Sequence, residues 1–314
     1  MGPRADPPGP AERRDRLIGA PGGSARSDGS PLSERGYPAR DGRCTGWTRL
    51  FFELSSWALG LLLVTIVIGA TAVGLVLGRR KRDRSDHLHK PVGSLQTAVL
   101  GVVGLVLAFG LALAVGRYEL RRAAVVDEAN AIGTTYLRAQ TLAEPQRSDS
   151  LELLVRYTDT SIRLSHAIPG SPTAAAAIAD GAVLQRELWG LAGQVLVGAP
   201  IDSAPRLYVE SLNEMIDLRT TRVSVLGNRV PGPVLTLEVV AAALALGLLA
   251  FYLAILGRGS FVVLIAAGLV CMLLLVTFDL DRPTRGLIDV PSTPLDNLRA
   301  SMSLPPAATG PTAP

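Results

Sequence analysis

Residues 261–288 read FVVLIAAGLVCMLLLVTFDLDRPTRGLI, and this stretch decides the fold class. The run from Phe261 to Phe278 contains no charge and no proline. Because a helix rises about 1.5 Å per residue, the run is long enough to cross most of the hydrocarbon core of a bilayer. Charged residues follow at once, and Pro283 lacks the N–H that would continue the helix. The stretch therefore predicts a membrane-spanning helix that ends in a charged exit at the level of the lipid headgroups.

The composition extends this prediction to the whole chain. Of the 314 residues, 48% are hydrophobic and 18% are charged, and the apolar residues gather in long runs, which is typical of a membrane protein. The three further runs are residues 54–77, 95–116 and 234–256. The net charge of +4 comes mainly from arginines beside these runs, which favours contact with anionic lipid over nucleic acid. We predict an all-α integral membrane protein with four transmembrane helices and no nucleic-acid partner.

The residues between the second and third runs are amphipathic. The pattern predicts that the second run continues into a soluble helix with Val125 and Ile132 on its apolar face. Arg121 and Glu128 are then expected on the opposite, polar face. Further helices are predicted at about residues 145–167, 172–197 and 203–228, the second of these with Ser171 as its N-cap. The pattern predicts a helical bundle inserted between spans two and three.

These patterns divide the chain into five parts. They are a disordered N-terminal tail at 1–49, transmembrane helices 1 and 2 within 50–116, a soluble helical insert at 117–233, transmembrane helices 3 and 4 within 234–280, and a charged exit with a disordered C-terminal tail at 281–314.

Span two carries small residues along one helix face, and Phe109 lies nearby. The small residues are Gly101, Gly104, Ala108 and Ala112. Two interpretations are open. Copies of this face can surround a narrow pore in an oligomer, with Phe109 as an apolar constriction. Alternatively, the small residues let another helix of the same chain approach closely.

The charged exit after the fourth run also has two interpretations. It consists of Asp279, Asp281, Arg282 and Pro283, which we call the exit motif. The carboxylates can tune ion entry at the mouth of a pore or bind a cation. The alternative, which we favour, is that the charges hold the membrane part to the insert through an ion pair of Arg282 with an acid of the insert. A further acid, Glu238, lies one turn into the third span. It either faces a water-filled path or, as we favour, is a protonated carboxylate or one that extends toward Arg229 and the headgroups.

Signals for catalysis are weak. The chain has no P-loop, no GxSxG and no dinucleotide-binding glycine pattern, and the His87-x-His89 pair lies in a short arginine-rich loop, where we expect a solvated pair rather than a metal site. We therefore expect no enzyme activity, no cofactor and no metal.

The exit motif and its surroundings resemble the bestrophin-like domain family of bacterial membrane proteins. The resemblance rests on Asp279-Leu280-Asp281-Arg282-Pro283, on Gly286-Leu287-Ile288, on Pro294-Leu295, on Arg121 and Asp127 to Asn130 after span two, and on Leu212, Asn213, Arg219 and Arg222 before span three. No match to the bestrophin neck residues or calcium clasp is present.

The resemblance implies a multi-pass protein of the cell membrane that forms a homo-oligomer and passes chloride or another small anion along span two. Positive residues near the span ends are balanced between the two sides, so the expectation that the tails and insert are cytoplasmic follows the resemblance. The alternative function is a membrane-anchored sensor or scaffold whose bundle binds a partner or ligand.

Overall fold

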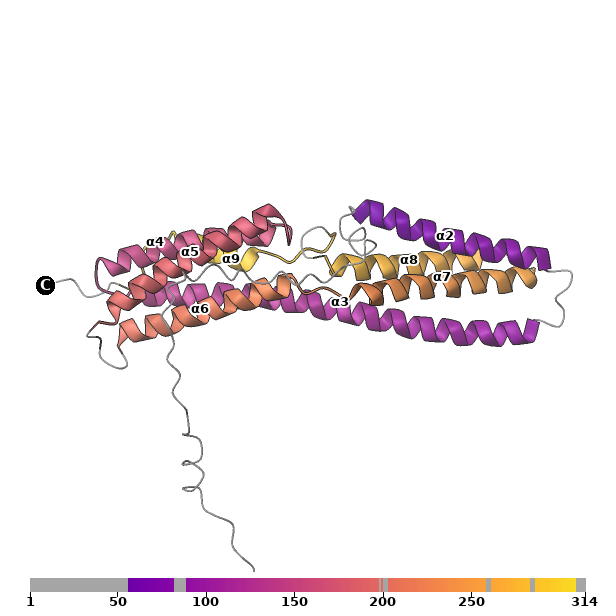
Figure 1. The fold of residues 1–314 in the computed structure, drawn as a ribbon, viewed down its shortest axis with the longest axis horizontal. Helices are drawn as coiled ribbons and strands as arrows, with labels where there is room; N and C mark the ends of the chain where they lie inside the picture. Colours follow the sequence, from indigo (N-terminus) through magenta and orange to yellow (C-terminus); the bar gives the residue numbers. More distant parts are fainter. Residues whose placement is uncertain are drawn as a thin grey trace, which may run out of the picture. The chain divides into compact units, whose positions relative to one another are not determined.

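The computed structural model describes residues 56–81, 89–197, 199, 203–257, 261–282 and 286–308, which all belong to one compact unit, Cys44–Pro314. These ranges are helical and contain no strand. The helices are α2 Ser56–Lys81, α3 His89–Ala139, α4 Gln146–His166, α5 Pro172–Val195, α6 Ala204–Leu226, α7 Gly232–Ile255, α8 Phe261–Leu280 and α9 Thr293–Ser301 (Figure 1). The predicted tail 1–49, His87, Pro283 and residues 309–314 lie outside the described residues.

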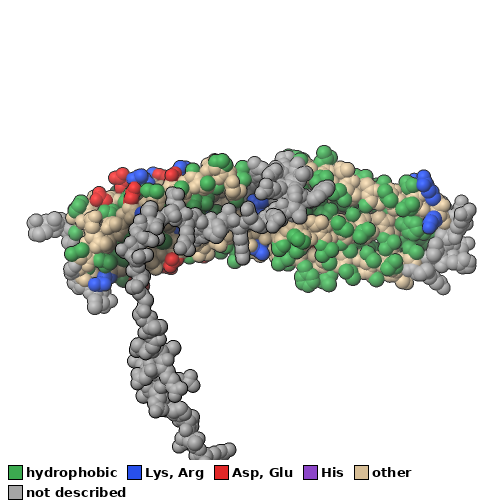
Figure 2. Space-filling view, viewed as in Figure 1, with side chains coloured by type: hydrophobic (Ala, Val, Ile, Leu, Met, Phe, Trp, Pro, Cys, Tyr) green, Lys and Arg blue, Asp and Glu red, His purple; other side chains and the backbone are tan. Residues whose placement is uncertain are grey.

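Four of these helices, α2, α3, α7 and α8, are long and apolar enough to cross a membrane. Hydrophobic side chains cover the visible surface of this part of the molecule, whereas charged side chains gather over the other helices (Figure 2). Helix α2 ends in Arg79, Arg80 and Lys81, cations that interact favourably with the negative end of the helix dipole. Helices α7 and α8 pack against each other, as the short connection between them requires. The prediction of an all-helical chain with four long apolar helices is confirmed.

A close backbone approach within the apolar helices joins α2 to α7. A Cβ atom on Gly74 of α2 would overlap the carbonyl oxygen of Gly247 of α7, and one on Gly78 would lie 2.6 Å from the carbonyl oxygen of Phe251. Glycine at these positions lets two helices meet at backbone distance, which is a common way to pack helices in lipid. The spacing of small residues in the sequence did not predict this contact.

The second half of α3 packs with α4, α6 and α9, and α5 joins them through α4 and α6. Their shared hydrophobic core includes Ile132, Leu154, Leu188 and Leu212. Helix α5 begins as predicted, because the Ala174 N–H donates to the Ser171 hydroxyl at 3.2 Å and Pro172 occupies the first turn.

Helix α9 was not predicted. It lies in the stretch 281–314 that the sequence analysis assigned to the exit and a disordered tail, yet Leu295 and Met302 are buried in the same core as Leu212. Tyr136 of α3 donates a hydrogen bond to the Met302 carbonyl at 3.2 Å. The core therefore extends into residues that the composition alone assigns to a tail.

Candidate functional site

The apolar half of α3 leaves the predicted small-residue face uncovered. Gly101, Gly104, Ala108 and Ala112 are exposed, and Phe109 beside them is 62% exposed. A Cβ atom on Gly101 or Gly104 would meet no described atom within 4 Å. The structure thus brings these residues onto one surface that no described part of the chain covers.

The opposite face of α3 holds this helix to the rest of the chain. Val103, Leu107 and Ala114 are buried in a core shared with α7 and α8. At 3.6 residues per turn these positions lie roughly opposite Gly101, Ala108 and Ala112. Packing within one chain therefore does not account for the small-residue face, because α3 docks through its other side.

The uncovered face of α3 also differs from a typical lipid-facing surface in the same structure. Helix α8 exposes large aliphatic side chains, with Leu264 at 60%, Leu269 at 66% and Met272 at 64%. The α3 face presents mainly glycine and alanine, with Leu105 on the face one turn after Gly101 and with Val102 and Leu113 beside it. Small residues on a membrane helix allow close approach of a neighbour, whereas lipid contact does not require them.

The same face remains uncovered beyond the apolar half. Ala123, Asn130 and Leu137 are exposed and continue the face at helical spacing, while Arg121, Ile132 and Ala139 on the other side are buried. From Gly101 to Leu137, at 1.5 Å per residue, the uncovered face is about 54 Å long. We call the uncovered surface from Gly101 to Leu137 the α3 free face. It runs along one helix from the apolar to the polar part of the molecule.

The exit motif is tied to α3 by a buried ion pair. Arg121 and Asp281 are both almost fully buried, with 3.7 Å between Nη2 and Oδ1. The Arg121 guanidinium also donates to the carbonyl oxygens of Asn228, Leu280 and Asp281 at 2.9–3.2 Å. Burial raises the pKa of the Asp281 carboxyl, while the Val230 N–H, at 2.9 Å, and Arg121 act in the opposite direction. This pair fastens the end of α8 and the α6–α7 connection to α3.

Asp279 has a separate role in shaping the chain after α8. Its carboxylate accepts hydrogen bonds from the Leu287 and Ile288 N–H groups at 2.8–2.9 Å. A Cβ atom on Gly286 would lie 2.7 Å from the Asp279 Oδ1, so this turn requires glycine. The described geometry supports the interface interpretation of the exit motif, because Asp281 pairs with Arg121 of α3. The predicted ion pair of Arg282 with an acid of the insert stays a prediction.

A second buried ion cluster lies among α3, α4 and α6. Glu128 is fully buried and pairs with Arg219 at 3.1 Å and with Arg222. The Ser161 hydroxyl donates to Glu128 at 3.1 Å, and Arg219 lies over the Tyr157 ring at 5.6 Å. Burial raises the pKa of the Tyr157 hydroxyl.

The prediction that Arg121 and Glu128 lie on a solvated polar face of α3 is wrong. Both are on the buried side, because each has partners from distant segments that satisfy its charge: Asp281 for Arg121, and Arg219 and Arg222 for Glu128. The residue types in this stretch gave no signal of those partners, since the partners lie about 90 to 160 positions away.

Glu238 is the third buried charged site, and it lies inside the apolar part. The side chain is fully buried in α7, and neither carboxylate oxygen has a hydrogen-bond partner among the described residues. It occupies the space that a side chain on Gly110 of α3 would fill. This placement excludes an extended side chain that reaches the headgroups.

No group of three or more metal-ligating residues occurs in the described ranges. The arrangement consists of four membrane-length helices fastened by buried charges to a group of charged helices, with one helix, α3, common to both. These features define an α-helical membrane protein.

The comparison with protein families identifies the family to which this membrane protein belongs. A family model described as Bestrophin-like domain matches residues 61–295, so the chain belongs to this family and is a bestrophin-related membrane protein. Comparison with curated proteins gave no match, and comparison with solved structures also gave none.

Proposed function

We propose that the chain forms a homo-oligomeric channel of the cell membrane that is permeable to chloride or another small anion. In this proposal each chain crosses the bilayer four times and places its α3 free face toward a central path. The observation that carries the proposal is that Gly101 and Gly104 lie on a membrane-length helix and have no described neighbour. In a ring of copies, small side chains on this face let the α3 helices come close to a common axis.

The residues of this face suit a narrow apolar path. Gly101, Ala108 and Ala112 leave room beside the axis, and the exposed Phe109 ring lies at the edge of the same face. An apolar ring in a pore can act as a constriction by excluding water. The family membership supports ion passage as the function, and the proposal assigns the chain no catalytic step.

We further propose that the tails and the helices inserted between α3 and α7 form a cytoplasmic bundle. The α3 free face continues through this part, so the bundle extends the path beyond the membrane. A single reactive cysteine tests the sidedness. The native cysteines are removed with Cys44→Ser and Cys271→Ser, and Asp180→Cys introduces one thiol at an exposed position. This thiol is expected to react with a membrane-impermeant reagent only after the cells are opened.

Chloride flux from liposomes that contain the purified chain tests the channel itself. Ala108→Trp is expected to reduce flux at least about tenfold, because an indole fills a narrow path. Leu269→Trp is the matched control, because Leu269 is an exposed residue of α8 and not of the α3 free face, and it should leave flux unchanged. Imaging of solubilised particles should show several copies per particle for both variants. A parent chain that gives no flux above empty vesicles at several pH values refutes the proposal.

A sensor or scaffold is the alternative, and the same measurements distinguish it. If Asp180→Cys reacts in intact cells, the inserted helices are outside the cytoplasm, and the proposed cytoplasmic extension of the path is wrong. If solubilised particles contain one copy only, no central path can form from α3. Either result favours a protein that binds a partner through its inserted helices.

A further inference from the structure

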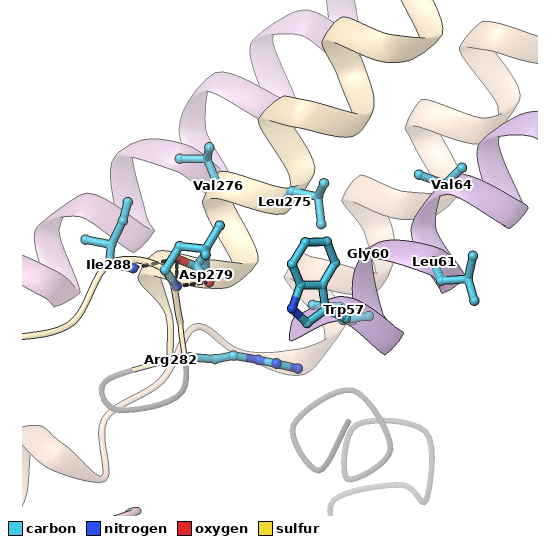
Figure 3. A pocket seen from close by; sticks show the side chains of 11 residues that line it. Trp57, Gly60, Leu61, Val64, Leu275, Val276, Asp279, Arg282 and Ile288 are labelled. Carbon is cyan, nitrogen blue, oxygen red and sulfur yellow. Dashed lines mark hydrogen bonds between the residues drawn. The ribbon is translucent and has the colours of Figure 1, made fainter. Parts of the chain in front are cut away.

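A pocket of about 760 Å³ lies between the start of α2 and the end of α8 (Figure 3). It is lined by Trp57, Leu59, Gly60, Leu61 and Val64 of α2, by Leu275, Val276 and Asp279 of α8, and by Arg282, Leu287 and Ile288. Almost all of this lining is apolar. The pocket is within the range of volumes that hold a small ligand, about 300–1,000 Å³.

The charged end of the pocket carries one carboxylate and one guanidinium, and the carboxylate is used by the turn after α8. Its two charged residues are Asp279 and Arg282. Both Asp279 oxygens already accept hydrogen bonds from the Leu287 and Ile288 backbone, so this carboxylate is engaged by the turn itself. Arg282 is itself only 4% exposed and has other contacts in the fold, so a phosphate would reach its guanidinium from inside the pocket that it lines. The guanidinium carries five N–H donors in a planar fork and can hold more than one acceptor.

The pocket lies where the apolar part of the molecule ends. Helix α8 ends at Leu280, next to the Arg121–Asp281 ion pair. The pocket extends back from this level toward Leu275 and Val64, and its rim includes Trp57 and Leu287, each 88% exposed. Exposed tryptophan beside membrane-length helices is typical of the interface between the hydrocarbon and headgroup layers. An occupant therefore meets an apolar space on one side and a cation at headgroup level on the other.

This combination selects among the molecules present at that depth. Acyl chains already lie in an apolar medium, so the apolar lining alone gives them little reason to leave the bilayer. A guanidinium at headgroup level adds a specific attraction for phosphate, which it can bind through two parallel hydrogen bonds. Basic pockets between membrane helices bind anionic lipid headgroups for this reason.

We propose that this pocket binds one anionic phospholipid, with an acyl chain between α2 and α8 and the phosphate at Arg282. The site is separate from the α3 free face and does not depend on the proposed channel. Bound lipid would fill the space between α2 and α8 that the protein leaves open at this level.

Trp57 is a built-in reporter for this site, because it lines the pocket and brominated acyl chains quench tryptophan on contact. In a chain with Trp47→Phe and Trp189→Phe, Trp57 is the sole tryptophan. The full chain is reconstituted in vesicles that contain either dibrominated phosphatidylglycerol or dibrominated phosphatidylcholine at the same mole fraction. We expect quenching by the anionic lipid to exceed quenching by the zwitterionic lipid at least about twofold.

Two variants separate a site from general attraction to a charged surface. Arg282→Gln should make the two lipids quench equally, whereas Arg122→Gln, which removes an exposed cation outside the pocket lining, should preserve the preference. Val276→Phe, which fills the pocket and keeps Arg282, should lower quenching by both lipids. Circular dichroism checks that each variant retains its helices.

Salt and free phosphate identify the occupant. The preference should persist at about 1 M salt, where attraction to an exposed surface is screened within about 3 Å. Inorganic phosphate should not abolish it, because phosphate lacks the acyl chain. Equal quenching by the two lipids in the parent chain overturns the proposal, and so does a preference that survives Arg282→Gln. Loss of the preference with inorganic phosphate indicates a free-anion site and also overturns it.

Discussion

Removing the charge of Glu128 should strongly destabilise the protein. Glu128 is the one carboxylate between Arg219 and Arg222 in the buried cluster, and both arginine side chains are at most 5% exposed. Glu128→Gln keeps the side-chain shape but removes the carboxylate that pairs with both buried guanidiniums among the described residues. Breaking a buried pair by removing one partner costs about 3–5 kcal/mol in free energy of unfolding.

This cost can be measured as a shift in apparent melting temperature. For a chain of this size, 1 kcal/mol corresponds to roughly 2–4 °C, so Glu128→Gln should melt about 6–20 °C below the parent chain. Circular dichroism of the detergent-solubilised protein at a fixed scan rate reports this shift, since unfolding of membrane proteins is often irreversible.

A surface ion pair provides the control for this prediction. Arg163 and Asp180 are 2.9 Å apart, and both side chains are about half exposed. Asp180→Asn should cost no more than about 1 kcal/mol, because solvent screens the pair. If Glu128→Gln melts as close to the parent chain as Asp180→Asn does, the cluster is not the stabilising element that its burial indicates. Adding Arg222→Gln to Glu128→Gln should recover part of the loss, since one unpaired charge is then removed.

Two further predictions concern other buried polar groups. Gly110→Ala should destabilise the contact between α3 and α7, because its methyl group would overlap the Glu238 carboxylate. Adding Glu238→Ala to the same chain should restore the melting temperature. If it does not, the assigned contact is wrong. Burial raises the pKa of the Tyr157 and Tyr208 hydroxyls above the ordinary value of 10.0, so the stability that these residues contribute is present below that pH and lost as pH rises further. Melting temperatures measured from pH 8 to 11 should therefore fall at the alkaline end. The fall should be less steep in Tyr157→Phe, because one such tyrosine lowers the free energy of unfolding by up to about 1.4 kcal/mol per pH unit. Equal slopes of melting temperature against pH in the two chains contradict the assignment.

The sequence was most informative where one physical requirement acts on many consecutive residues. A membrane-length helix needs an apolar run, and the helices α2, α7 and α8 therefore follow the runs at 54–77, 234–256 and 261–278 closely. The N-cap of α5 could also be predicted from the sequence, because Ser171 and the proline after it act only on their own helix end.

The sequence was least informative where the decisive partner is distant. Arg121 and Glu128 have the same neighbours in the sequence whether they are solvated or buried. Their burial depends on contacts with Asp281, Arg219 and Arg222, which are distant in the sequence. Small residues gave the same difficulty. Spacing shows that Gly101 and Gly104 share a face, but it does not show that close packing within the chain uses Gly74 and Gly247 instead.

The buried charges and the uncovered glycines of α3 are best understood together. Arg121 and Glu128 each bind partners from other segments on one side of the helix, and this fixes the rotation of α3 about its axis. A fixed rotation is necessary if the opposite face is to meet other copies in a defined way, because a helix free to rotate presents no constant surface. The α3 free face is therefore held outward by interactions that lie entirely within one chain. In the proposed oligomer this face of each copy is directed toward the common axis, and Ala108→Trp tests whether it lines the path.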